Sequence, residues 1–254
     1  MLLAVDIGNS NIVLGAIKAG KVLFEARIAT DLIRTSDQYA VEIKDILELY
    51  DVKGNQFEGC IISSVVPPLL NSFRTAVRKL TGKMPLIVGS DIRTDLKIAI
   101  DNPSQVGGDL LVGAVAALRH YQPPMAIVDM GTATTITVID EAGTFIGGCI
   151  CPGVRISMEA LNSRTAQLPG ISLQAPQRVI GRNTIDCMQS GIMVGAASML
   201  DGLIERIEEE AGRKLSVIVT GGISRFVIPM CRHEMIYDKD LLLKGLWALY
   251  EMNR

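Results

Sequence analysis

The sequence predicts a protein of two α/β domains, each with a mixed sheet and flanking helices. Short apolar strands alternate with helical patterns along the 254 residues. A pattern of apolar strand, Asp, apolar residue and Gly occurs twice, at 3–11 and at 127–135, as expected of duplicated halves. The Pro-rich joint at 121–124 is the boundary that we expect between domains 1–122 and 123–254.

The first half is expected to open with a β-meander and to continue with alternating helices and strands. Thr35 and Gln38 have the spacing of a capping box, and apolar residues follow at helical intervals, which predicts a helix near 36–50. Pro67 ends the buried strand at 59–66. The predicted elements are strands at 2–5, 12–17, 22–28, 59–66 and 86–88, and helices at 36–50, 69–80 and 110–118, the last buried and Ala-rich.

The second half starts again with strands and then becomes helical. Its predicted elements are strands at 126–129, 135–139 and 144–146, helical segments around 155–166 and 186–210, and a strand at 215–219 before Gly221 and Gly222.

Composition and charge exclude several classes of protein. A chain that is 48% hydrophobic and 20% charged is globular rather than disordered or fibrous. The net charge is -2 with acids and bases dispersed, so we expect no nucleic-acid partner. The first residues lack the features of a signal peptide, and no apolar run approaches the ~18 residues of a membrane span. We therefore expect a soluble, cytoplasmic protein with no membrane partner.

The five cysteines are an odd number at irregular spacing, and four of them have apolar or small neighbours, which suits reduced, buried thiols. Cys149 and Cys151 could in principle hold a metal. No second pair occurs, however, and the nearest histidine is His120, so we favour a structural role. The cysteines are Cys60, Cys149, Cys151, Cys187 and Cys231.

Each Asp-x-Gly loop has the composition of a phosphate-binding hairpin. Gly allows close approach of the backbone to phosphate, hydroxyl and amide groups donate to phosphate oxygens, and the Asp can hold Mg²⁺. One copy alone could equally be an ordinary hairpin turn, but two copies in the same strand context favour phosphate binding. The loop residues are Asp6, Gly8, Asn9, Ser10 and Asn11 in the first copy and Asp129, Gly131 and Thr132 in the second.

Two other phosphate-binding motifs are excluded. Residues 15–22 have the glycine and lysine spacing of a P-loop, but Val22 stands where Mg²⁺ binding needs Ser or Thr, and the segment lies in a predicted hairpin. No G-x-G-x-x-G occurs at a strand–helix junction, which argues against a dinucleotide-binding fold.

Two further elements complete the candidate site. The Thr-Gly-Gly at 220–222 follows a buried strand and could pack flat against adenine or ribose, or be a turn before the next helix. Asp109 opens the Ala-rich helix and could be only its N-cap. A kinase nevertheless needs a carboxylate to orient and deprotonate the acceptor hydroxyl, and Asp109 is a candidate for this role.

The order of these loops resembles the actin-like (ribonuclease H-like) ATPase superfold, which actin, Hsp70 chaperones and sugar kinases share. Seven motifs in order, spanning nearly the whole chain, resemble type III pantothenate kinase more specifically. The most distinctive are D-x-G-T-A-T-T at 129–135 and G-G-x-I-x-P-G at 147–153. The others are D-x-G-N at 6–9, S-x-V-P at 64–67, N-P-x-x-x-G-x-D at 102–109, T-A-x-L-P at 165–169 and T-G-G at 220–222.

The resemblance implies a homodimer that uses ATP to phosphorylate the primary hydroxyl of pantothenate to 4'-phosphopantothenate, the first step of coenzyme A synthesis. It also implies Mg²⁺ and a monovalent cation, K⁺ or NH4⁺. The implied roles are phosphate and Mg²⁺ binding for Asp6 to Asn11, phosphate binding for Gly131 and Thr132, adenosine binding for Gly221 and Gly222, monovalent-cation binding for Asp129, lining of the pantothenate pocket for Gly107 and Gly108, proton abstraction for Asp109, and closure of the pocket across the dimer for Thr184.

Three residues on the acceptor side depart from the family pattern. Leu110 stands where the family has Arg, Gly113 where it has Asn, and Ile100 where many members have an aromatic residue. Leu supplies neither charge nor hydrogen bond. Loss of a charge-assisted contact costs ~1.5–3 kcal/mol, roughly 10- to 150-fold in rate or affinity.

Two alternatives stay open beside pantothenate phosphorylation. One is a kinase of the same fold that acts on another small alcohol, which Leu110 suggests. The other is a non-catalytic, nucleotide-binding regulatory protein. The presence of all three candidate carboxylates argues against this second alternative, because loss of catalysis would free Asp6, Asp109 and Asp129 to change.

Overall fold

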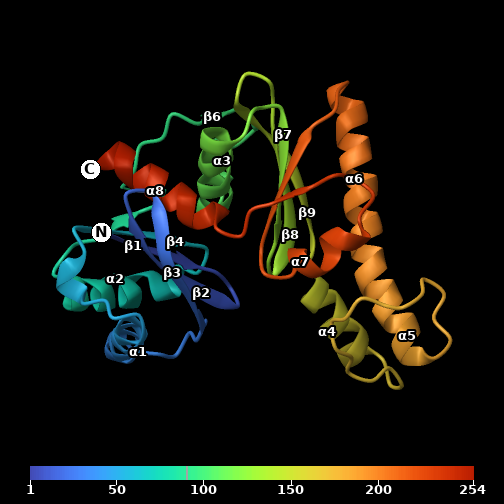
Figure 1. The fold of residues 1–254 in the computed structure, drawn as a ribbon, viewed down its shortest axis with the longest axis horizontal. Coiled ribbons are helices and arrows are strands. Elements are labelled where there is room, and N and C mark those ends of the chain that lie inside the picture. The colour runs from blue at the N-terminus through green and yellow to red at the C-terminus, as the bar shows by residue number, and fades with distance from the viewer. Residues whose placement is uncertain (90) are drawn as a thin grey trace. The chain divides into compact units, whose positions relative to one another are not determined.

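The computed structural model describes residues 1–89 and 91–254, and the chain forms two compact units (Figure 1). The first unit contains residues 1–96, 101–120 and 240–254, and the second contains 97–100 and 121–239. Because the units are defined by packing, the C-terminal residues 240–254 belong to the first unit. The division into domains 1–122 and 123–254 stays a prediction.

The sheet of the first unit, sheet 1, has the strand order β3-β2-β1-β4-β5. Its strands are β1 (Leu2–Ile7), β2 (Asn11–Lys18), β3 (Lys21–Ala29), β4 (Gly59–Ser64) and β5 (Leu86–Ile87). The first three form the predicted antiparallel meander, whereas β4 and β5 run parallel to β1. Ala19 and Gly20 both have positive φ, 49° and 77°, which suits the tight two-residue turn between β2 and β3.

Helices cover both faces of sheet 1 (Figure 1). They are α1 (Ser36–Leu49), α2 (Pro67–Thr81), α3 (Gly108–His120) and α8 (Leu241–Asn253), with short 3-10 turns at Gly54–Gln56 and Pro103–Gln105. On one face Val5 packs with Tyr39 of α1 and Phe73 of α2. On the other face Ala4 packs with residues of α3 and α8. The capping box at Thr35 is present, and α1 begins where it was predicted.

The sequence pattern predicts no element over residues 241–253, where the structure shows α8. This helix is apolar on most sides because it packs closely against α3 as well as against sheet 1. A Cβ at Gly245 would lie 2.2 Å from the carbonyl oxygen of Val112, so the two helices approach closely there. A helix buried on most faces lacks the period that makes amphipathic helices visible in a sequence.

The sheet of the second unit, sheet 2, has the order β11-β10-β7-β8-β9-β6. Its strands are β6 (Lys97–Ile98), β7 (Met125–Met130), β8 (Ala133–Ile139), β9 (Thr144–Pro152), β10 (Ser216–Thr220) and β11 (Ile236–Tyr237). β7, β8 and β9 form an antiparallel meander, and β10 and β11 run parallel to β7. These five strands therefore repeat the order and directions of sheet 1, as the duplicated Asp-x-Gly pattern predicts.

The helices of the second unit follow β9 and β10. They are α4 (Val154–Arg164), α5 (Thr184–Gln189), a π-helical turn (Ser190–Val194), α6 (Gly195–Ala211), α7 (Ser224–Val227) and a 3-10 turn (Ile228–Met230). The run Thr184–Ala211 is long and apolar enough to cross a membrane by length and composition alone. Its residues Ile192, Ala197 and Leu200 are buried in the core of sheet 2, which favours a core helix.

All five cysteines are free thiols. Burial raises the pKa of Cys60 to about 11 and that of Cys231 to about 12, so both thiols are protonated at neutral pH and are poor nucleophiles. The expectation of buried thiols is confirmed for Cys60 alone, because Cys149, Cys151 and Cys231 are half-buried and Cys187 is exposed on α5.

Candidate functional site

The first Asp-x-Gly loop joins β1 to β2. Asp6 lies near the end of β1, opposite Val13, and Gly8 donates its backbone N–H to the carbonyl of Asn11 at 3.0 Å. Thr30, the residue after β3, holds the loop, because its hydroxyl donates to the Gly8 carbonyl at 2.6 Å. The residues at the tip are exposed, so their hydroxyl and amide groups can reach a ligand; they are Asn9, Ser10 and Asn11.

The second loop joins β7 to β8 in the same way. Asp129 lies near the end of β7, and Gly131 donates its N–H to the carbonyl of Ala133 at 3.0 Å. Thr132, which is half-buried, accepts a hydrogen bond from the N–H of Gly153 at 3.2 Å. Gly153, the last residue of the G-G-x-I-x-P-G motif and the N-cap of α4, therefore supports the second Asp-x-Gly loop.

The Thr-Gly-Gly segment adjoins the second loop. Thr220 pairs with Asp129 in the parallel register of β10 and β7. Gly221 has φ of +98°, and a Cβ there would lie 2.6 Å from the carbonyl oxygen of Met130, so the position requires glycine. The Ser224 hydroxyl donates to the Gly221 carbonyl at 2.5 Å. The predicted adenosine loop and second phosphate loop thus lie side by side at one edge of sheet 2.

Asp109 lies in the first turn of α3, which begins at Gly108, rather than before the helix. Its Oδ1 accepts the backbone N–H of Leu110 at 2.9 Å. Burial raises the pKa of the Asp109 carboxyl, and backbone hydrogen bonds from Leu110 and Asp109 itself oppose this only in part. A Cβ at Gly107 would lie 2.5 Å from Asp109 Oδ1, so glycine keeps space open beside the carboxylate.

Ser63 of β4 is a candidate that the sequence analysis missed. It pairs with Asp6 in the parallel register of β4 and β1 and is fully buried (0% exposed). A Cβ at Gly108 would lie 3.4 Å from its Oγ, so Ser63 adjoins the start of α3. Ser63 therefore lies next to Asp6 within sheet 1 and next to Gly108 at the start of α3. A polar residue at the end of an otherwise apolar strand is the signal that could have identified it.

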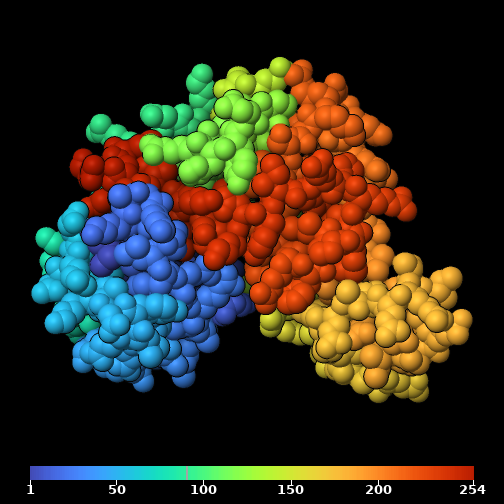
Figure 2. All heavy atoms as spheres, in the orientation of Figure 1, coloured from blue at the N-terminus to red at the C-terminus, as the bar shows by residue number. Residues whose placement is uncertain are grey.

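Thr184 lies in the second unit as the first residue of α5, and it is exposed. A cavity of about 420 Å³ adjoins it, lined by Gln167, Pro169, Asn183, Thr184 and Ile185. Two of these residues belong to the T-A-x-L-P motif. The segment between α4 and α5 forms a lobe of this unit, gold in Figure 2.

The three residues that depart from the family pattern have different surroundings. Leu110 is half-buried on α3. Gly113 is buried where α3 meets α8, and a Cβ there would lie 3.7 Å from Leu242, in ordinary contact. Ile100 adjoins β9, because its Cγ2 would lie 4.0 Å from a Cβ at Gly147.

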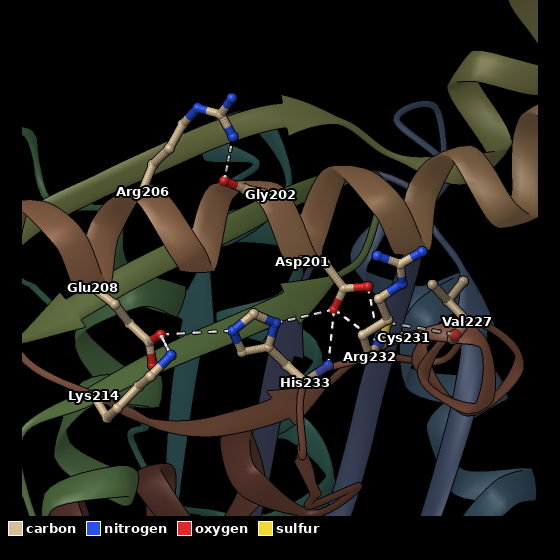
Figure 3. Close-up of polar contacts among 9 residues, drawn as sticks. All are labelled: Asp201, Gly202, Arg206, Glu208, Lys214, Val227, Cys231, Arg232 and His233. Carbon is tan, nitrogen blue, oxygen red and sulfur yellow. Dashed lines mark hydrogen bonds and ion pairs between the residues drawn. The ribbon is translucent and has the colours of Figure 1, made fainter.

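A buried polar network ties α6 to the segment after α7 (Figure 3). The Asp201 carboxylate accepts the backbone N–H groups of Arg232 and His233 at 2.9 and 3.0 Å. The His233 ring lies between Asp201, 3.2 Å from Nδ1, and Glu208, 3.6 Å from Nε2. Lys214 donates to Glu208 at 2.6 Å. Figure 3 shows the side chains of Asp201, His233 and Glu208 in a row, and none of the three is a predicted site residue.

The network lowers the pKa values of its two carboxyl groups. Burial alone would raise the pKa of Asp201, but hydrogen bonds from the backbone of His233 and Arg232 and from the His233 ring outweigh it. Burial would likewise raise the pKa of Glu208, and hydrogen bonds from Lys214 and the N–H of Leu215 outweigh it. The network therefore stabilises the second unit with both carboxylates ionised.

Comparison with known proteins shows both the family and the fold. Residues 2–206 match the family model of type III pantothenate kinase. A type III pantothenate kinase of Bacillus cytotoxicus is 41% identical over 253 residues, covering 100% of this chain and 97% of the relative.

Solved structures with low sequence identity share the fold. The activator of 2-hydroxyisocaproyl-CoA dehydratase from Clostridium difficile, with bound ADPNP, has a TM-score of 0.56 at 14% identity, covering 98% of this chain and 92% of that one. The ROK hexokinase of Thermus thermophilus has a TM-score of 0.52 at 10% identity, covering 100% and 99%. The predicted actin-like ATPase fold is thereby confirmed.

Proposed function

Because this chain belongs to the type III pantothenate kinase family, we propose that it transfers the γ-phosphoryl group of ATP to the primary hydroxyl of pantothenate. The product is 4'-phosphopantothenate, and the reaction is the first step of coenzyme A synthesis. The observation that carries the proposal is the 41% identity to a curated pantothenate kinase across the whole chain.

The first loop binds the phosphates of ATP together with Mg²⁺. Asp6 offers a half-buried carboxylate beside exposed amide and hydroxyl groups. Mg²⁺ in nucleotide sites is held by one or two carboxylates with water and substrate phosphates, so this donor set fits the ion. When bound, Mg²⁺ neutralises charge on the phosphates. The protein residues that bind ATP are Asp6, Gly8, Asn9, Ser10, Asn11, Gly131, Thr132, Gly221 and Gly222.

Asp129 holds the monovalent cation, K⁺ or NH4⁺. Its half-buried carboxylate lies at the end of β7, next to Thr220 of β10. Within the described residues, no group of three or more His, Cys, Asp or Glu side chains is arranged to hold a metal ion. Asp129 is the residue that would hold the cation, and its carboxylate would supply a negatively charged oxygen ligand.

Asp109 accepts the proton of the acceptor hydroxyl during in-line transfer. Its pKa is raised by burial, which makes the ionised carboxylate a stronger base than an exposed one. Gly107 leaves space beside the carboxylate, and Gly107 and Gly108 line the pocket for the pantothenate chain. The protein thus positions the acceptor hydroxyl against the γ-phosphoryl group, which is its main contribution to phosphoryl transfer.

The enzyme acts as a cytoplasmic homodimer in which Thr184 closes the pantothenate pocket of the partner. Large apolar side chains are exposed on the second unit, as expected of a surface that a partner covers. Ile150 on β9 is 76% exposed, and Val179 and Ile180 before α5 are 69% and 83% exposed. Sedimentation or light scattering measures the oligomeric state, and a monomer at the concentration of the assay would contradict this part of the proposal.

The test is an ATP-consumption assay with and without pantothenate, in K⁺ and then in Na⁺, with the product identified by mass. Pantothenate-dependent ADP formation that is faster in K⁺ is expected. ADP formation that ignores pantothenate would sink the proposal.

Leu110 favours one second candidate, a kinase for another small alcohol. Where the family has Arg, this chain offers a half-buried apolar side chain next to the base. A panel of alcohols with ATP separates the two candidates. Turnover of another alcohol in preference to pantothenate would favour the second, and a Leu110→Arg variant that improves pantothenate use would favour the first.

A further inference from the structure

The side chain of Ser63 faces the helix that carries the proposed base. Ser63 lies two residues after Ile61 on β4, so both side chains are on the same face of sheet 1. Ile61 packs with Val112 and Val115 of α3. Ser63 is therefore on the α3 side, next to Asp6 in the strand register.

The Ser63 hydroxyl is an unsatisfied buried group. In the part of the chain that the structure describes, its Oγ is buried and has no hydrogen-bond partner. A buried hydroxyl without a partner destabilises a protein, and such groups are rare unless they serve a function. Alanine would fill the same place without this cost, so the retained hydroxyl requires an explanation.

Asp109, the residue after Gly108, can accept further hydrogen bonds. The Asp109 carboxylate accepts the N–H of Leu110, a short-range bond within its own turn. A carboxylate has two oxygens and about four lone-pair sites, so it can accept further hydrogen bonds. Burial also raises the pKa of Asp109, as expected of a carboxylate with too few donors. The Ser63 hydroxyl, which has no acceptor, thus adjoins Gly108, and the residue after Gly108 is an Asp that can accept a further hydrogen bond.

Gly108 makes their approach possible. A Cβ at this position would lie 3.4 Å from Ser63 Oγ and from Val88 Cγ1, so a side chain there would fill the space between β4 and the first turn of α3. Glycine keeps this space free of a side chain.

We propose that Ser63 is a positioning residue for phosphoryl transfer, and that its hydroxyl donates a hydrogen bond to the Asp109 carboxylate when the acceptor is bound. The bond holds the base toward the acceptor hydroxyl. The inference rests on the proposed function, in which Asp109 is the base. Asp6 lies beside Ser63 on β1, Glu25 and Arg27 of β3 lie on the same face of sheet 1, and Val88 after β5 is apolar.

The test compares Ser63→Ala with Ser64→Ala. Loss of a hydrogen bond to the ionised base is expected to lower kcat about tenfold in Ser63→Ala. Because the lost donor favours the ionised form, the pKa of the base rises, and the acid limb of the kcat–pH profile moves to higher pH. The midpoint of thermal unfolding should not fall, because the hydroxyl has no partner in the unliganded protein.

Ser64→Ala is the matched control. Ser64 is the next residue on the strand, and its Oγ accepts the N–H of Val66 at 3.1 Å, just before α2. This variant is expected to unfold at a lower temperature while kcat and its pH profile stay at the wild-type values. The two serines thus separate a structural hydroxyl from a positioning one.

The outcomes distinguish the inference from the function it rests on. If the wild type turns over pantothenate and Ser63→Ala matches it in kcat, or loses activity without moving the acid limb, the positioning role is wrong and the proposed function stands. If the wild type shows no pantothenate-dependent turnover, the proposed function fails and the inference fails with it.

Discussion

The two Asp-x-Gly hairpins occupy equivalent places in sheets with the same strand order, yet they are built differently. In the first, four residues separate the paired Ile7 and Ile12; in the second, three residues separate the paired Met130 and Thr134. The longer loop has an exposed polar tip and is held by Thr30. The shorter loop is held by Gly153 of the adjoining motif. The two hairpins therefore share one arrangement of strands and differ in loop length and in the residue that supports the loop.

The two hairpins also differ in the residue that pairs with their Asp on the neighbouring parallel strand, β4 for the first and β10 for the second. Asp6 of the first copy pairs with Ser63, and Asp129 of the second pairs with Thr220. Both partners are buried hydroxyl residues at the end of a parallel strand. Gly221 follows Thr220 and turns the chain with positive φ. Ser64 follows Ser63, and its hydroxyl accepts the N–H of Val66, just before α2. One equivalent position thus leads to a proposed adenosine loop and the other to a helix.

The largest expected difference between the units concerns proton transfer, which we assign to the first unit alone. Asp109→Asn should lower kcat by about 10²- to 10⁴-fold because the amide cannot accept the proton. Nucleotide binding, measured by calorimetry, should survive. Asp101→Asn is the control, since Asp101 is exposed in the segment before α3 and has no proposed role. Undiminished turnover by Asp109→Asn would remove it as the base.

The second prediction concerns the equivalent carboxylates of the two hairpins, Asp6 and Asp129, each replaced by an amide. Asp6→Asn should raise the Mg²⁺ concentration needed for half-maximal turnover, and Asp129→Asn should raise the K⁺ concentration needed for half-activation. Each change removes a charged ligand, so an effect of about 10- to 150-fold is expected in each case. Titrations of Mg²⁺ and K⁺ on both variants measure it. Identical responses of the two variants would show that the hairpins do not divide the ions as proposed.

The third prediction concerns the glycines of the two loops. A Cβ at Gly8 would lie 3.0 Å from the Asn11 carbonyl oxygen, whereas a Cβ at Gly131 would lie 3.6 Å from the Ala133 carbonyl oxygen. Gly8→Ala should therefore lower the free energy of unfolding by about 1 kcal/mol, and Gly131→Ala should change it by less than about 0.5 kcal/mol. Urea denaturation measures both. Equal losses would mean that the loops tolerate side chains alike.

The smallest expected effect is a pH dependence in the second unit. The pKa values of Asp201 and Glu208 are lowered from 3.8 and 4.5, so their stabilisation is present above those values and is lost as the pH falls through the lower folded-state values. The thermal midpoint should therefore fall less on acidification in Asp201→Asn than in the wild type. Glu209→Gln, an exposed neighbour of Glu208, should behave like the wild type. Parallel acid responses of all three proteins would contradict the prediction.

Helices and strands whose apolar residues recur at a regular spacing could be predicted from the sequence. The capping box at Thr35 and the apolar spacing after it predict α1 to within a residue, and the alternation before it predicts the meander. β9 extends to Pro152, well past the predicted 146, because its half-buried positions carry Gly147, Cys149 and Cys151 while Ile150 is exposed, so hydrophobicity does not follow burial along the strand. The short edge strands β6 and β11 pair over only two residues and leave no pattern to read.

The site was predictable where chemistry repeats and not where it depends on contacts. Asp6 and Asp129 stand out because the same motif occurs twice, and Gly221 stands out as one of a glycine pair. Ser63 does not, because a serine at the end of a strand is common and its importance depends on what it meets in space. The roles of Asp109 and Thr184 remain predictions that the variants above and the oligomeric state can test.

The return of α8 to the first unit has a consequence for folding during translation. Leu243, Leu246 and Leu249 of this helix complete the core that includes Leu2, Ala4 and Ile61. The ribosome makes α8 only after all of the second unit, so α3 alone can cover this face of sheet 1 while the second unit can already fold. The first unit to be synthesised is therefore the last to close, and its nascent apolar face is where a chaperone should bind.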